Sequence, residues 1–254
     1  MTMKRSMMTV LSVAAVVLVF GLAAQAATTI TIEATPSQVP DENLPAINYG
    51  DAPVGFGPDS WQNTQTGGKV NWHARYAQDG DYLSALFPTQ AATLTVNDIA
   101  SISYWTKRPD GTAASEDWAA FIYTRPVEGG DSGWYGYRFV NDYGTHTETD
   151  MWNQYSTDSG MEFRKNSGTT TGYMSLADVK TTYGDELVEM ISIQTMSNYE
   201  SFNGYMDGLS ITLTDGSVGN VNFVVPEPST LVLLALGGLT ALGAAWFRRR
   251  RAGR

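Results

Sequence analysis

The sequence predicts an all-β protein, an antiparallel β-sandwich with one short helix. The first observation is a period of two, because apolar and polar side chains alternate along 29–32, 99–105 and 209–213. Such alternation is typical of strands with one face on a core. The second observation is a set of Asp-Gly or Asn-Gly pairs between the runs, which favour hairpin turns. These pairs are Asp79-Gly80, Asp110-Gly111, Asn203-Gly204, Asp207-Gly208 and Asp215-Gly216.

Further strands are expected where short runs are rich in aromatic and β-branched residues. In chain order these runs are 70–76, 82–87, 118–123, 135–140, 188–195 and 221–225. With the alternating segments they give about nine to eleven strands. One segment differs: Leu176, Val179 and Tyr183 are three and four positions apart, which predicts a short helix over 175–183 that Gly184 ends. Residues 34–66 contain five prolines, and we expect a long irregular loop there.

Residues 1–26 have the features of a secretory signal peptide. Lys4 and Arg5 precede an apolar stretch over 10–24, and Ala24 and Ala26 are small residues at the two positions that signal peptidase recognises. We therefore expect signal peptidase to remove this segment during export. An uncleaved N-terminal anchor is the alternative. Residues 27–224 then form one domain of ordinary size, which we call the body.

Residues 225–254 contain three signals in order. The motif Pro226-Glu227-Pro228 comes first, and an apolar run of 18 residues without a charge follows over 230–247. At about 1.5 Å per residue this run makes roughly 27 Å of helix, close to the ~30 Å hydrocarbon core of a bilayer. We expect a transmembrane helix there. The basic tail over 248–254 would hold its far end in the cytoplasm, and the tail begins with Arg248, Arg249, Arg250 and Arg251.

This order of parts resembles the PEP-CTERM sorting signal of Gram-negative bacteria. The resemblance implies processing by an exosortase, a membrane transpeptidase-like enzyme. It also implies a transient anchor in the inner membrane, followed by release to the cell surface or to the extracellular matrix. A plain single-pass anchor is the alternative. Both ends of the chain place the body on the non-cytoplasmic side, so we expect an exported protein.

Acidic residues dominate the body. With the terminal segments set aside, 9 basic residues stand against 25 acidic ones, a net charge of −16. Such a surface repels nucleic acid, so DNA and RNA are not expected as partners. The chain contains no cysteine, which excludes disulfides, thiolate catalysis and metal sites that use a cysteine thiolate.

No catalytic motif stands out, and we predict that the protein is not an enzyme. The string Gly130-Asp131-Ser132-Gly133 resembles the nucleophile segment of chymotrypsin-like proteases. However, only 59 positions separate Ser132 from His73, too few for that two-barrel fold. Glu148 and Asp150 are expected on one strand face, and paired carboxylates serve glycoside hydrolysis. A polysaccharide lyase or hydrolase on a jelly-roll fold is therefore the alternative.

The second half of the body resembles extracellular jelly-roll modules of the laminin-G or carbohydrate-binding type. The residues that carry the resemblance are 175–180, Tyr183-Gly184-Asp185 and 204–211. In those modules a short helix precedes a strand, and an Asp-containing final strand closes the sheet. The resemblance implies a jelly-roll form of the sandwich and a structural calcium ion at Asp207. No other cofactor is expected.

Aromatic side chains are the remaining functional candidates. Trp134, Tyr135 and Tyr137 form the densest group, and Trp152 is nearby in sequence. Sugars stack on exposed aromatic rings, although a sandwich core also buries such rings. We therefore predict a non-catalytic surface or matrix protein that binds exopolysaccharide, in a biofilm for example, through these four residues. A purely structural surface protein without a ligand is the further alternative.

Overall fold

A computed structural model describes most of the body. It covers 27–35, 47–49, 52–53, 55–56, 59–63, 70–78, 81–113, 115–165, 172–196, 198–199 and 202–224. The predicted signal peptide, the apolar run over 230–247 and the arginines after it lie outside these residues. Within the covered ranges, no helix is both long enough and apolar enough to cross a membrane.

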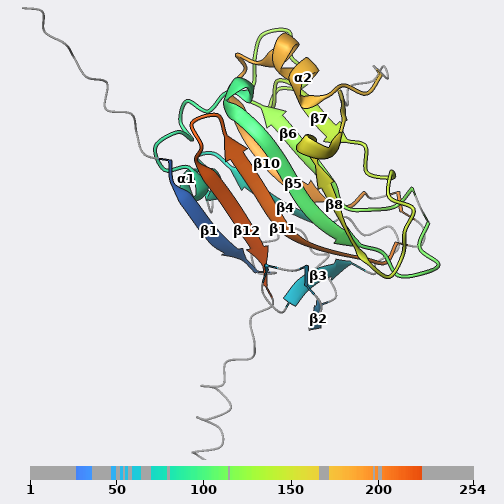
Figure 1. Cartoon of the computed structure of the whole chain (residues 1–254). Helices are drawn as coiled ribbons and strands as arrows, with labels where there is room; N and C mark the ends of the chain where they lie inside the picture. Colours follow the sequence, from blue (N-terminus) through green and yellow to red (C-terminus); the bar gives the residue numbers. More distant parts are fainter. Residues whose placement is uncertain are drawn as a thin grey trace, which may run out of the picture.

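Two sheets form the body, which confirms the predicted all-β sandwich (Figure 1). The seven-stranded sheet contains β1 (Thr29–Ala34), β2 (Ile47–Tyr49), β3 (Asp59–Asn63), β5 (Ile99–Lys107), β8 (Trp152–Ser156), β11 (Gly204–Leu213) and β12 (Val218–Phe223). The five-stranded sheet contains β4 (Asn71–Arg75), β6 (Ala119–Thr124), β7 (Arg138–Asn141), β9 (Phe163–Lys165) and β10 (Val188–Gln194). Figure 1 looks onto the larger sheet, with the smaller one behind it.

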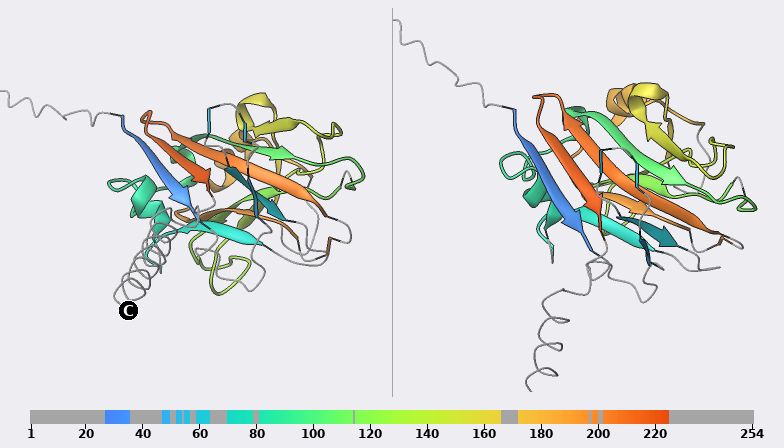
Figure 2. Two further views of the ribbon diagram at one scale, coloured as in Figure 1. Left: turned by 90° about the horizontal axis from the view of Figure 1, so that it is seen from below. Right: turned by 60° about the horizontal axis from the view of Figure 1, so that its bottom comes forward.

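Strand β11 is the centre of the seven-stranded sheet. One edge pairs with β5, which in turn pairs with β8. The other edge pairs with β12 along its C-terminal part and with β3 along its N-terminal part. The sheet therefore branches at Asp207 and Gly208, where the register shifts and Gly208 has a φ of +65°. Strand β1 lies beside β12, the last strand, and pairs with it in parallel (Figure 2).

An apolar core fills the space between the sheets. On β5 the buried Ile102 and Tyr104 alternate with half-exposed neighbours, as predicted from the period of two. Trp61 and Trp72 pack edge-on against Phe223, with ring centroids 4.9 and 5.3 Å apart. Edge-to-face contacts of this kind add about 0.5–1.5 kcal/mol each beyond simple burial. Phe223, the last residue of β12, is thereby locked into the core.

The predicted helix is confirmed as α2 (Leu176–Tyr183). Ser175 Oγ accepts a hydrogen bond from Asp178 N at 3.2 Å, and Asp178 Oδ2 accepts one from Ser175 N at 3.0 Å. This reciprocal pair is a capping box. Gly184 ends the helix in the ordinary right-handed conformation, with a φ of −60°. Glycine is therefore not required there for a left-handed turn, and its role is to leave space. A side chain there would collide with Asn97.

The strand expected at 82–87 is wrong, because these residues form a helix, α1 (Tyr82–Leu86). Asp81 caps the helix, since its Oδ1 accepts a hydrogen bond from Ser84 N at 2.9 Å. Leu83 and Leu86, three positions apart, are both buried. Apolar and polar side chains do not alternate along 82–87 as they would in a half-buried strand. The helical spacing of the two leucines and the cap at Asp81 therefore outweigh the β propensity of this segment.

Two further expectations need correction. The irregular loop expected at 34–66 contains β2 and β3, which pair with each other and, through β3, with β11. The strand expected at 135–140 begins only at Arg138. Tyr135 belongs instead to the connection between β6 and β7. It packs with Phe121 and Tyr123 in a second apolar cluster on the outer face of the five-stranded sheet.

Candidate functional site

The four predicted glycan-binding residues lie in three places. Trp134 and Tyr135 lie together over the outer face of the five-stranded sheet. Tyr137 packs against Tyr183 of α2, with ring centroids 4.8 Å apart. Trp152 is the first residue of β8, in the other sheet. The structure therefore brings together Trp134 and Tyr135 and places the other two elsewhere.

Backbone hydrogen bonds fold the connection between β6 and β7 back onto the sheet. Gly136 N donates to Thr124 O at 2.9 Å, and Asp131 N donates to Gly136 O at 2.6 Å. A side chain at position 136 would collide with the carbonyl of Arg125, so glycine permits this close approach. The connection thereby carries Trp134 to a position above β6.

Trp134 is exposed, but its ring is supported by neighbouring rings. The residue is 45% exposed, and its indole stacks on Tyr123 with centroids 5.4 Å apart and planes 30° apart. Tyr135 meets the indole edge-on at 4.5 Å and is itself buried. A ring that is already fixed costs little conformational entropy when a ligand binds. Trp134 thus offers a rigid, flat apolar surface to solvent.

Two arginines lie near Trp134 and Tyr135, in one row of the sheet. Arg75 of β4 and Arg138 of β7 lie in register with Tyr123, in a row that crosses four strands. The guanidinium carbon of Arg75 is 5.7 Å from the centroid of the Trp134 ring, and that of Arg138 is 5.5 Å from Tyr135. Both distances lie within the range of cation–π contacts. We call Arg75, Trp134, Tyr135 and Arg138 the arginine-flanked platform.

A second aromatic surface lies on the outer face of the seven-stranded sheet. Trp152, Lys107 and Tyr205 form one row across β8, β5 and β11. The ring centroids of Trp152 and Tyr205 are 6.5 Å apart, and Lys107 Nζ lies 5.8 Å from the centroid of the Tyr205 ring. Trp105 occupies an outward position too, because its neighbour Tyr104 is buried in the core. Trp105 and Tyr205 were not predicted as site residues, although the alternation along β5 marks Trp105 as outward.

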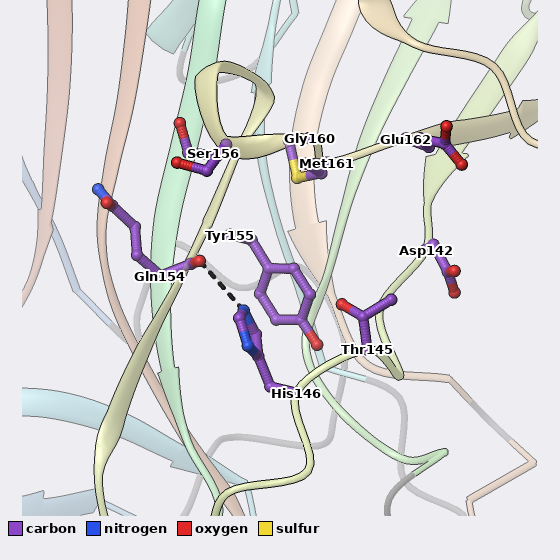
Figure 3. A pocket seen from close by; sticks show the side chains of 10 residues that line it. Asp142, Thr145, His146, Gln154, Tyr155, Ser156, Gly160, Met161 and Glu162 are labelled. Atoms are coloured by element: carbon purple, nitrogen blue, oxygen red, sulfur yellow. Dashed lines mark hydrogen bonds between the residues drawn. The ribbon is translucent and has the colours of Figure 1, made fainter.

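A cavity of about 260 Å³ lies beside β8 (Figure 3). Its lining includes the carboxylates of Asp142 and Glu162, together with His146 and Tyr155. His146 Nε2 lies 3.0 Å from the carbonyl oxygen of Gln154, so it donates its proton to that backbone group. These residue types can carry acid–base chemistry, and this cavity is the place to look for it.

The strongest acid–base candidates near this cavity are committed to structural bonds. Tyr155 OH donates to Asp117 Oδ2 at 3.2 Å, and burial raises the pKa of Tyr155 well above its usual value. Asp117 is fully buried beside Arg108, whose Nε lies 3.6 Å from Oδ2. Burial raises the pKa of Asp117 to about 6, against the opposing effect of its hydrogen bonds and of Arg108. Glu148 and Asp150 lie in the connection between β7 and β8, so they do not share the strand face that was expected.

Asp207 lies where the seven-stranded sheet branches, on the penultimate strand β11 and not on the final strand as predicted. Its Oδ1 accepts hydrogen bonds from Gly208 N at 2.6 Å and from Phe223 N at 2.9 Å. At this point along β11 the neighbouring strand changes from β12 to β3, so Phe223 N of β12 has no partner in the ladder. The Asp207 side chain accepts its hydrogen bond instead. Its Oδ2 is buried without a hydrogen-bond partner in the part of the chain that the structure describes. Burial raises the pKa of Asp207 to about 7; the two N–H groups lower it, and nearby Asp59 raises it further.

The unpartnered oxygen of Asp207 is one ligand that a calcium ion would use. Asp59 is a second carboxylate near it, and the negative charge of Asp59 raises the pKa of Asp207. Calcium takes six to eight oxygen ligands. Among the residues that the structure covers, no group of three or more His, Cys, Asp or Glu side chains is arranged to hold a metal ion. Backbone carbonyls or water would have to complete the shell, so calcium at Asp207 stays a prediction.

The body ends at a residue that is bonded on both sides. Val224 follows β12; its N donates to Ala34 O at 2.9 Å, and its O accepts from Trp61 Nε1 at 3.2 Å. From this residue onward, 224–251 match a family model described as the PEP-CTERM protein-sorting motif. The chain carries a PEP-CTERM sorting motif. This confirms the resemblance seen in the sequence.

The PEP-CTERM motif indicates a secreted protein that an exosortase sorts to the cell surface of Gram-negative bacteria. The motif starts without a spacer, because only Val225 separates the bonded Val224 from Pro226. The transmembrane helix predicted within the motif lies outside the described residues and stays a prediction. A comparison with curated protein sequences finds no match for this chain.

Proposed function

We propose that this exosortase-sorted chain is a non-catalytic, polysaccharide-binding protein of the extracellular matrix, associated with exopolysaccharide in a biofilm. The observation that carries the proposal is the exposed, rigidly supported ring of Trp134. Sugar rings present apolar C–H faces that pack on an indole, and a matrix protein meets polysaccharide wherever it is exported. The ring is preorganised, so its burial under a sugar contributes to affinity with little ordering cost.

One observation favours binding over catalysis. The phenol of Tyr155 is bonded to the buried carboxylate of Asp117, so neither group is available to a substrate in the cavity beside β8. An acid–base mechanism needs such groups within reach of the substrate.

A polysaccharide hydrolase is the second candidate, because Asp142 and Glu162 both line the cavity beside β8. Glycoside hydrolysis requires two carboxyl groups on either side of one bond. The test is the release of reducing ends from the exopolysaccharide of the host over a day at 25 °C. Release that disappears in the Glu162→Gln variant would establish an enzyme and refute the non-catalytic proposal.

Binding is tested with the full chain in mild detergent and the exopolysaccharide of its host. We expect Trp134→Ala to weaken binding about 10-fold or more, since exposed tryptophans that anchor a ligand typically contribute about 2 kcal/mol. Trp152→Ala is the matched control, because it removes the same side chain from the opposite sheet, and we expect a change below about twofold. If Trp152→Ala alone abolishes binding, the site lies on the seven-stranded sheet instead. Absence of binding by the unmodified chain would leave the purely structural alternative.

A further inference from the structure

Arginines are concentrated on one face of an acidic body. The net charge of the body is −16, yet Arg75, Arg138 and Arg164 occupy outward positions on the five-stranded sheet. They come from three different strands, β4, β7 and β9. The residue beside each arginine in its strand belongs to the core between the sheets; these residues are Ala74, Phe139 and Phe163. Because successive side chains of a strand point to opposite faces, the arginines point outward. The aromatic row on the opposite sheet contains one cation, Lys107.

Each ring of the exposed aromatic pair has an arginine near it. The guanidinium carbon of Arg75 lies 5.7 Å from the Trp134 ring, and that of Arg138 lies 5.5 Å from the Tyr135 ring. Glu189 Oε1 accepts a hydrogen bond from Arg75 Nε at 2.8 Å, and the side chain of Arg75 is 28% exposed. A guanidinium has five donors in a fixed fork. The bond to Glu189 therefore orients Arg75 and leaves capacity for a ligand.

We infer that the arginine-flanked platform binds an anionic polysaccharide, one whose repeating unit carries a carboxylate or sulfate group, such as a polyuronate. The inference rests on the proposed polysaccharide binding at Trp134 and names the class of ligand. One sugar ring lies on the indole, and its acid group, or that of the next sugar, meets Arg75 or Arg138. Arginine and carboxylate form charge-assisted, often bidentate hydrogen bonds. A neutral glucan would use the indole but neither guanidinium.

The negative charge of the body does not prevent this contact. At physiological ionic strength the Debye length is about 8 Å, so repulsion from distant carboxylates is screened while an arginine in contact with the ligand acts fully. Duplex DNA is also a polyanion, but its bases are stacked inside the helix and offer no free ring face to Trp134. The combination of an exposed ring with two flanking cations therefore favours an acidic sugar over nucleic acid.

The experiment compares polygalacturonate with neutral dextran as ligands of the full chain in mild detergent, by isothermal titration calorimetry. Arg138→Gln and Arg75→Gln should each lower the affinity for polygalacturonate about 10-fold, as the loss of one charge-assisted hydrogen bond does. The affinity for dextran should stay unchanged. Lys107→Gln is the matched control, since it removes one positive charge from the opposite sheet, and should change neither affinity by more than about twofold.

Arg75→Gln also breaks the ion pair with Glu189, so a loss of affinity in that variant could come from a disturbed fold. A measurement on the unmodified chain avoids this problem. Raising NaCl from 0.1 to 1 M should weaken binding of the unmodified chain to polygalacturonate at least about 10-fold and leave dextran unaffected. Equal affinity for the two polymers, or an Arg138→Gln variant that behaves like Lys107→Gln, would overturn the ligand class but not polysaccharide binding. Failure to bind any glycan would overturn the proposed function itself. Duplex DNA bound as tightly, with the same dependence on Arg138, would also overturn the inference.

Discussion

Replacing Asp207 with asparagine should stabilise the protein above pH 7 in the absence of calcium and have little effect at pH 4. Asparagine has the same shape, and its Oδ1 can keep the hydrogen bonds from Gly208 N and Phe223 N. The substitution removes the ionisation of a buried carboxyl group. The second carboxylate oxygen of Asp207, Oδ2, has no hydrogen-bond partner among the described residues. In asparagine an uncharged amide nitrogen takes its place.

The magnitude follows from the pKa of Asp207, which burial raises from 3.8 to about 7. Because the folded-state pKa is raised, the folded protein holds this proton more tightly than the unfolded chain does. The stability contributed by the group is fully present below pH 3.8 and is lost as the pH rises through 7. Each pKa unit corresponds to 1.36 kcal/mol. Ionisation of Asp207 therefore costs on the order of 4 kcal/mol above pH 7, and Asp207→Asn removes most of that cost.

The assay is urea unfolding of the full chain in mild detergent at pH 4, 6 and 8 with EDTA, followed by tryptophan fluorescence. The control is Asp215→Asn, because Asp215 lies in a turn where the backbone N–H of Ser217 lowers its pKa. That control should lose stability at pH 8 and gain none. If Asp207→Asn lowers the free energy of unfolding equally at every pH, the reasoning about its buried oxygen is wrong.

Calcium is tested in the same assay. If a calcium ion binds at Asp207, adding calcium should raise the free energy of unfolding of the unmodified chain at pH 8. The Asp207→Asn variant should then show no response to calcium. No response in the unmodified chain would contradict the predicted calcium site.

Two other substitutions test the packing around the site. Asp117→Ala should cost about 3–5 kcal/mol of unfolding free energy, because it leaves Arg108 buried without its carboxylate; a loss below about 1 kcal/mol would show that water replaces the pair. Gly136→Ala should destabilise by about 1–3 kcal/mol, since its methyl group collides with the carbonyl of Arg125. It should also displace Trp134, so polysaccharide affinity should fall in parallel, and an unchanged affinity would refute the link between this turn and the platform.

The features predicted well from the sequence are those that depend on near neighbours in the chain. Alternation along β5 places Tyr104 in the core and Trp105 outside because successive side chains of a strand point to opposite faces. The cap formed by Ser175 and Asp178 involves residues three apart. The sorting motif is likewise a contiguous pattern.

The features that were missed depend on pairing between distant segments. Trp134 and Trp152 are 18 positions apart, yet β7 pairs with β6 in one sheet and β8 pairs with β5 in the other. Their separation in space follows from that pairing and not from their spacing. The exposure of Trp134 likewise depends on how the connection before β7 folds back. Arg75 comes near Trp134, and Arg138 near Tyr135, only because four strands align in register.

The intact mass of the mature protein, isolated from its host, tests most directly the claim that the chain is exported, processed at both ends and displayed as a surface protein. We predict a mass that corresponds to a chain beginning after Ala26 and ending close to Pro226-Glu227-Pro228. A mature protein that still contains Trp246 and the arginines after it would contradict exosortase processing. One that still contains Lys4 and Arg5 would contradict cleavage by signal peptidase.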